Sequence, residues 1–70
     1  MSDSIYKVIE IIGSSSISWE DAAKKAIARA TKTLEGLRIA EVIEQDLKIE
    51  DGAIVAYRTK LRVSFRFKDE

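Results

Sequence analysis

The side chains able to do chemistry in this 70-residue sequence are carboxylates, basic groups and hydroxyls, because it contains neither histidine nor cysteine. The commonest general base and the thiolate metal ligands are therefore absent, and no disulfide can form within it. Glu44 and Asp46 stand two residues apart, and carboxylate oxygens are the hard donors that calcium prefers. This spacing on a strand predicts a metal site or, more simply, two solvated carboxylates on one face.

Three consecutive serines, Ser14–Ser16, could in principle supply a nucleophile. A serine nucleophile needs an adjacent base, and here there is no histidine and no lysine placed for that role. The segment is instead predicted to be a polar turn. Since no triad, dyad or metal-hydrolase motif is present either, we do not expect an enzyme.

The charge balance also narrows the range of partners. Twelve basic and twelve acidic residues give a net charge of zero, which argues against a nucleic-acid partner bound through bulk electrostatics. No apolar run approaches the roughly 20 residues of a membrane span, and Met1–Ser4 does not resemble a signal peptide. A cytoplasmic protein with no nucleic-acid or membrane partner is expected.

Hydrophobic periodicity and turn residues divide the chain into four elements in one α+β domain covering residues 1–70. A β-branched segment ends at Gly13, and an apolar stripe at three- and four-residue spacing follows Ser18, which stands three residues before Asp21 as in a capping box. Gly36 is the expected end of the helix and Asp51-Gly52 the expected hairpin turn. The predicted elements are a strand over about 5–12, a helix over about 19–34, and strands over about 37–49 and 54–67.

The hairpin turn also predicts which residues face each other. With Asp51-Gly52 at the tip, Leu61 lies opposite Val42, Val63 opposite Ala40, and Arg58 opposite Gln45. The last strand alternates apolar and basic residues through Phe67, so one face packs on the helix and the other is solvated. If the last strand lies between the other two, the result is a three-stranded antiparallel sheet wrapped on one helix.

Two features predict that this β-α-β-β subunit associates with copies of itself. The strands are much longer than the helix, so the far end of the hairpin needs cover from another chain. On the middle strand, aliphatic residues are expected on the outer face beside the basic residues. The basic face could bind phosphate or carboxylate groups, or Arg62 could simply pair with Glu41 across the hairpin. The expected aliphatic row is Ile39, Ile43, Leu47 and Ile49.

The sequence resembles the dodecin family along nearly its whole length. The resemblance is carried by the order and spacing of four segments rather than by any one of them. They are YKVIEIIGSSS (Tyr6–Ser16), SWEDAAKKAIARA (Ser18–Ala30), AEV (Ala40–Val42) and YRTKLRVSF (Tyr57–Phe65).

The resemblance implies a hollow homododecamer that stores a small ligand, with flavin (riboflavin or FMN) as the usual cargo. It places Ile39 at the flavin-stacking tryptophan position and Arg58 at the flavin-bonding glutamine position. An aliphatic side chain has no π-face, and arginine cannot accept a hydrogen bond. These two residues could therefore line a ligand pocket or belong to a subunit interface. The segment VIEQDL (Val42–Leu47) is more similar to a calcium-binding branch of the family, so a calcium-binding or purely structural dodecin is the alternative.

Overall fold

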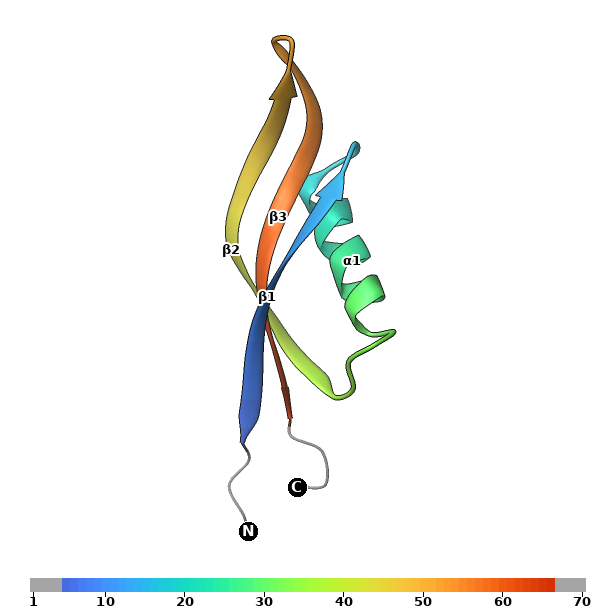
Figure 1. The fold of residues 1–70 in the computed structure, drawn as a ribbon, viewed down its shortest axis with the longest axis vertical. Helices are drawn as coiled ribbons and strands as arrows, with labels where there is room; N and C mark the ends of the chain where they lie inside the picture. Colours follow the sequence, from blue (N-terminus) through green and yellow to red (C-terminus); the bar gives the residue numbers. More distant parts are fainter. Residues whose placement is uncertain (1–4, 67–70) are drawn as a thin grey trace.

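The computed structural model describes residues 5–66 and contains one helix and one three-stranded sheet (Figure 1). The strand order is β1-β3-β2, and β3 pairs with both neighbours in antiparallel fashion. The predicted β-α-β-β topology and the central position of the last strand are confirmed. Phe67, predicted at the end of that strand, lies outside the described residues. The elements are β1 (Tyr6–Ser15), α1 (Trp19–Ala30), β2 (Leu37–Glu50) and β3 (Ala53–Arg66).

The predicted hairpin turn is confirmed. Both turn residues have positive φ, 51° at Asp51 and 78° at Gly52. This combination defines the type I′ turn, whose twist matches that of the flanking strands. Asp and Gly are the residues that tolerate this geometry, which is why the sequence predicted it correctly.

The helix begins where predicted but is shorter than predicted. Ser18 Oγ accepts a hydrogen bond from the Asp21 backbone N–H at 3.0 Å, so Ser18 caps the helix. The last helical residue is Ala30 rather than Leu34. The hydroxyls of Thr31 and Thr33 donate to the carbonyls of Ala28 and Ala30, so these β-branched residues close the helix at its last turn. Within residues 5–66, no helix has the length and apolarity needed to cross a membrane.

Gly13 does not end β1, contrary to prediction, but lies inside it. A Cβ atom at this position would overlap the Ala22 carbonyl oxygen and come within 2.9 Å of the Ala26 Cβ. Gly13 and Ala22 are both buried. The glycine therefore lets the helix approach the sheet closely, which is a tertiary requirement rather than a turn signal.

The hydrophobic core lies between α1 and the middle of the sheet. Leu61 and Val63 on β3 are each 1% exposed, and Ala22 on the helix is fully buried. The helix packs on β1 and β3, while the β2–β3 hairpin continues well beyond it (Figure 1). Twelve helical residues span about 18 Å, whereas fourteen strand residues span about 46 Å. The molecule is accordingly elongated, measuring 55 × 20 × 14 Å.

The predicted register holds beneath the helix and again next to the hairpin turn, where Ile49 lies opposite Ile54, and it is wrong between these two regions. Val42 lies opposite Leu61 and Ala40 opposite Val63, as predicted. A β-bulge between Val42 and Glu44 then shifts β2 by one residue, so Arg58 lies opposite Asp46 and not Gln45.

Because side chains alternate with period two, this shift exchanges the faces of the next part of β2. Leu47 now lies opposite Tyr57 on the helix side of the sheet, and Ile49 follows it on that side. The predicted outer row is therefore wrong for these two residues, although Ile39 keeps its outer position opposite Ser64. Ile43 is the extra residue of the bulge and is half-buried. The outer face instead receives Glu44 and Asp46.

Candidate functional site

The outer face of the hairpin carries a bidentate ion pair between Asp46 of β2 and Arg58 of β3. Arg58 Nε donates to Asp46 Oδ1 at 2.7 Å, and the second guanidinium nitrogen donates to Oδ2 at 2.8 Å. The two residues lie directly opposite each other in the sheet. Both carboxylate oxygens therefore have a partner, in the planar geometry that makes arginine–carboxylate pairs strong.

The ion pairs continue along the same face. Lys60 Nζ lies 3.6 Å from Glu44 Oε1, and the Arg62 guanidinium lies between Glu10 of β1 at 3.1 Å and Glu41 of β2 at 3.7 Å. The alternative that Arg62 pairs with Glu41 is confirmed, and Glu10 is a partner that sequence reasoning missed. The ion pairs of Glu44 and Asp46 left a signal in the sequence. A shift of β2 by one residue from the predicted register brings both carboxylates opposite cations.

The ion pairing changes the proton affinities of the central pair. The hydrogen bonds from Arg58 hold the pKa of the Asp46 carboxyl below its usual range, and Asp46 in turn raises the pKa of Arg58. Both groups are therefore charged near neutral pH. An ionised carboxylate is the form that binds a cation, so Asp46 is in the correct state to serve as a metal ligand.

The structure brings the two predicted metal ligands, Glu44 and Asp46, onto one exposed face. Their oxygens suit a hard cation, but each carboxylate already contacts a basic side chain. Residues 5–66 contain no group of three or more acidic side chains arranged to hold one ion. One chain thus offers two carboxylates, fewer than the roughly 6–8 oxygens that calcium takes. A calcium ion held here would need further oxygens from carbonyls, water or another chain.

Ile39 and Arg58 share the outer face but are not brought together within one chain. Ile39 lies opposite Ser64, six residues from Arg58 on β3, which corresponds to about 20 Å along a strand. The Ile39 side chain is 67% exposed and offers no ring for stacking. Arg58 already donates to Asp46. These residues do not fit a stacked flavin held by a hydrogen-bond acceptor.

Trp19, the first residue of α1, anchors the β2–β3 hairpin to the helix. Its indole Nε1 donates to the Asp46 backbone carbonyl at 3.0 Å, and its ring meets the Tyr57 ring edge-on at a centroid distance of 5.3 Å. Its own carbonyl accepts a 2.9 Å hydrogen bond from Thr59 Oγ1. The first residue of α1 therefore fixes the part of the hairpin that carries the Asp46–Arg58 pair. The clue was a tryptophan at the very start of the apolar stripe.

The serine segment has a structural role. Ser15 is buried, and its hydroxyl donates to Asp21 Oδ2 at 2.6 Å while accepting from the Ile17 backbone N–H at 2.9 Å. Ser15 also belongs to β1, so the predicted turn is shorter than Ser14–Ser16. The hydrogen bond from Ser15, followed by the one from Lys25, holds the pKa of Asp21 below its usual range. This hydroxyl connects the end of β1 to the helix start.

Comparison with known proteins gives a consistent result. The Dodecin family model matches residues 5–68. A calcium dodecin of Mycobacterium tuberculosis is 48% identical over 65 residues, covering 93% of this chain and 92% of that protein. The crystal structure of the M. tuberculosis calcium dodecin, described as having a novel calcium-binding site, superimposes with a TM-score of 0.83 over 94% of both chains at 48% identity.

A dodecin from Streptomyces davaonensis superimposes with a TM-score of 0.91 at 32% identity, covering 97% of this chain and 100% of that one. The match of sequence and fold thus extends over nearly the whole molecule. The resemblance carried by the four segments, AEV of β2 included, is confirmed. The chain belongs to the dodecin family.

Proposed function

We propose that this chain is a subunit of a non-catalytic, homo-oligomeric dodecin that binds and buffers a small ligand, and that the ligand is calcium. The observation that carries this proposal is the exposed pair Glu44 and Asp46, which the β2 bulge places on one outer face. The identity of 48% to a protein named calcium dodecin supports the choice of ion.

Calcium would be held by Glu44 and Asp46 in place of their present cationic partners. Lys60 and Arg58 would have to release the two carboxylates before calcium binds them. Calcium binding would therefore replace two existing ion pairs. Two carboxylates leave most of the coordination shell unfilled. Completion by symmetry-related chains would couple calcium binding to assembly, for which the family resemblance implies a dodecamer.

Thermal melting with and without calcium tests this proposal. A ligand that binds only the folded assembly stabilises it by about 2.7 kcal/mol at a hundredfold excess over its dissociation constant. We expect the melting temperature to rise in millimolar calcium and to return with a chelator. Glu44→Gln with Asp46→Asn should abolish the rise, whereas the control Glu20→Gln, an exposed acid on the helix, should retain it.

A melting curve indifferent to calcium and chelator would contradict the calcium assignment. The native mass of the purified protein checks assembly independently, and a discrete high oligomer, a dodecamer in particular, is expected. A stable monomer at micromolar concentration would contradict the assembly.

Flavin storage is the second candidate, supported by family membership and opposed by Ile39 and Arg58. One stacking contact is worth about 0.5–1.5 kcal/mol beyond burial, and the lost burial of a ring adds to it, so riboflavin should bind at least about tenfold more weakly than to a tryptophan-bearing dodecin. Ile39→Trp with Arg58→Gln should restore quenching of flavin fluorescence. A yellow purified protein that binds riboflavin tightly would favour flavin over calcium.

A further inference from the structure

A short part of the β2–β3 pairing is shifted by one residue relative to the pairing on both sides of it. This shifted segment consists of Glu44–Lys48 on β2 and Ala56–Lys60 on β3. At one end of the segment β2 contributes an extra residue, Ile43, and at the end near the turn β3 contributes another, Val55. Because the two extra residues lie on opposite strands, the second shift cancels the first. The pairs directly on either side of the segment therefore share one common register.

A second register is available to the shifted segment. Moving its two strands past each other by one residue would absorb Ile43 and Val55 into the ladder and leave the neighbouring pairs unchanged. Asp46 would then no longer lie opposite Arg58. Because side chains alternate with period two, Glu44 and Asp46 would also move from the outer face to the helix side. The register of this segment thus decides which way the two carboxylates face.

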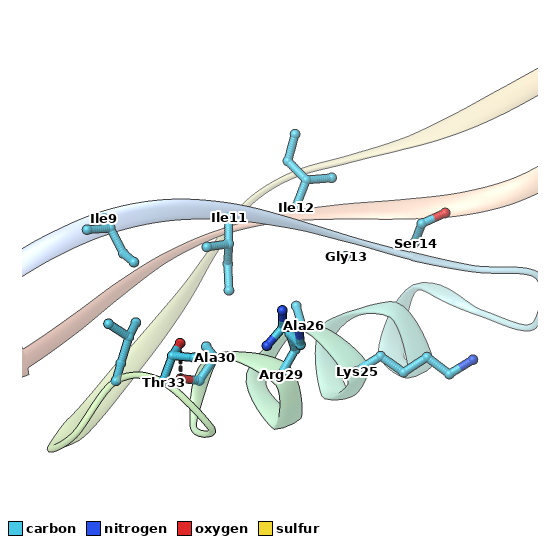
Figure 2. A pocket seen from close by; sticks show the side chains of 11 residues that line it. Ile9, Ile11, Ile12, Gly13, Ser14, Lys25, Ala26, Arg29, Ala30 and Thr33 are labelled. Carbon is cyan, nitrogen blue, oxygen red and sulfur yellow. Dashed lines mark hydrogen bonds between the residues drawn. The ribbon is translucent and has the colours of Figure 1, made fainter.

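The other side of β3 is fixed by β1 and the helix. β1 pairs with β3 along its whole length without a register shift. Figure 2 shows the regular alternation of this strand, with Ile11 pointing toward α1 and Ile12 pointing to the other side of the sheet. The close approach of Gly13 to Ala22 holds β1 and the helix together. The choice of register is therefore a choice of where β2 lies against this frame.

Trp19 contacts both strands of the shifted segment from the helix side. Its indole Nε1 donates to the Asp46 backbone carbonyl of β2 at 3.0 Å. On β3, its ring meets the Tyr57 ring edge-on, and its carbonyl accepts a hydrogen bond from the hydroxyl of the fully buried Thr59. A slip by one residue turns each residue of β2 over, so it would reverse the Asp46 carbonyl and break its bond to the indole.

We propose that Trp19 is a positioning residue that selects the register of the shifted segment and thereby keeps Glu44 and Asp46 on the outer face. The ion pairs of the two carboxylates favour the same register, but they are exposed, and exposed pairs contribute little stability. The consequence for ligand binding rests on the proposed function, because these carboxylates are the proposed calcium ligands. The choice of register does not depend on it.

Disulfide formation between introduced cysteines distinguishes the two registers, and the natural chain has no cysteine to interfere. Ala56 lies opposite Lys48 in the observed register and would lie opposite Leu47 in the other one. Lys48→Cys with Ala56→Cys therefore reports the observed register, and Leu47→Cys with Ala56→Cys reports the alternative. Each protein is oxidised with diamide under native conditions, and the rate of intrachain disulfide formation is followed by peptide mass spectrometry.

With Trp19 in place, the cysteine pair at positions 48 and 56 should oxidise faster than the pair at 47 and 56. Trp19→Phe keeps a ring but removes the indole donor. It should shift the ratio of the two rates toward the second pair by about fivefold, the factor typical of one hydrogen bond. The control Tyr57→Phe keeps its ring against Trp19 and should leave the ratio unchanged. A ratio that Trp19→Phe does not change, or faster oxidation of the second pair with Trp19 in place, would overturn the inference.

Removing the two extra residues gives a second test, which separates the choice of register from general stability. Deleting Ile43 and Val55 together leaves a continuous ladder in the observed pairing, so Trp19 is no longer needed to select it. Trp19→Phe should reduce the calcium-induced rise in melting temperature of the full-length chain and leave that rise unchanged in the deletion variant. An equal reduction in both chains would overturn the positioning role. A natural protein that ignores calcium would contradict the proposed function alone, because the cysteine ratio is measured without calcium.

Discussion

Beneath α1, Leu61 and Val63 of β3 are buried to 1% exposure, whereas beyond the helix the β2–β3 hairpin leaves Ile49 62% exposed. In the covered region a close helix–sheet contact at Gly13 fixes the packing. In the uncovered region the hairpin is held by ion pairs on its outer face and by Trp19 at its base.

The two regions differ in what determines their register. Where a core exists, a one-residue slip would expose every buried side chain, so the alternation of the sequence prevails. Where there is no core, opposite charges across the strands favour a bulge that pairs Asp46 with Arg58. The residues that are free from packing are therefore the ones to which we assign the proposed ligand and the proposed subunit contacts.

The largest expected difference between the two regions comes from removing one leucine in each. Leu61→Ala should cost about 2–5 kcal/mol of unfolding free energy at every protein concentration, because it opens a cavity in the core. Leu47→Ala should act through subunit association, so the loss of unfolding free energy that it causes should depend on protein concentration. Urea denaturation at several concentrations measures both. A concentration-independent loss of equal size in Leu47→Ala would contradict the comparison.

A single methyl group should also perturb the covered region strongly. Gly13→Ala places a Cβ against the Ala22 carbonyl, so α1 must move away from β1, at a cost of about 1–3 kcal/mol for overpacking. The neighbouring control Ser14→Ala changes an exposed residue and should stay within about 0.5 kcal/mol of the natural protein. If the two variants unfold at the same denaturant concentration, the close packing at Gly13 is not a source of stability.

The link between the two regions should be weaker. Trp19→Phe keeps a ring beside Tyr57 but removes the hydrogen bond to the Asp46 carbonyl, with an expected loss of about 1 kcal/mol. Tyr57→Phe keeps the same ring contact and serves as the control, with a smaller expected loss. Hydrogen exchange at residues 44–48 should become faster in Trp19→Phe alone. Unchanged exchange there would mean that Trp19 does not anchor the hairpin.

The smallest effect should be the acid sensitivity of the Asp46–Arg58 pair. The pKa of Asp46 is lower in the folded chain than its usual value of about 3.9. The pair therefore stabilises the fold above that value, and its contribution is lost as the pH falls through the lowered pKa.

Melting between neutral pH and acid measures this contribution. Asp46→Asn should lose less stability than the natural protein over the acidic part of that range. Added salt should reduce the difference, because the pair is exposed and its charges are screened. Identical acid dependence of the two proteins at low salt would show that the pair does not stabilise the fold.

Sequence patterns by themselves determined the element types, their order, the Asp51-Gly52 turn and the register under the helix. These features follow from local periods and from turn chemistry, which each segment carries within itself. The lack of an aromatic side chain at Ile39 was equally visible, because the residue type is read directly from the sequence.

Only the tertiary structure decided that Gly13 lies inside β1, that the helix ends at Ala30, and that β2 bulges at Ile43. Each depends on a contact between distant segments: a helix backbone against a strand, threonine hydroxyls on the last helical carbonyls, and charges across a hairpin. Such contacts compete with the local conformational preference of each segment. The observed structure depends on packing and pairing energies between segments, which no single segment contains. The bulge thus determined which face Glu44 and Asp46 share with Arg58.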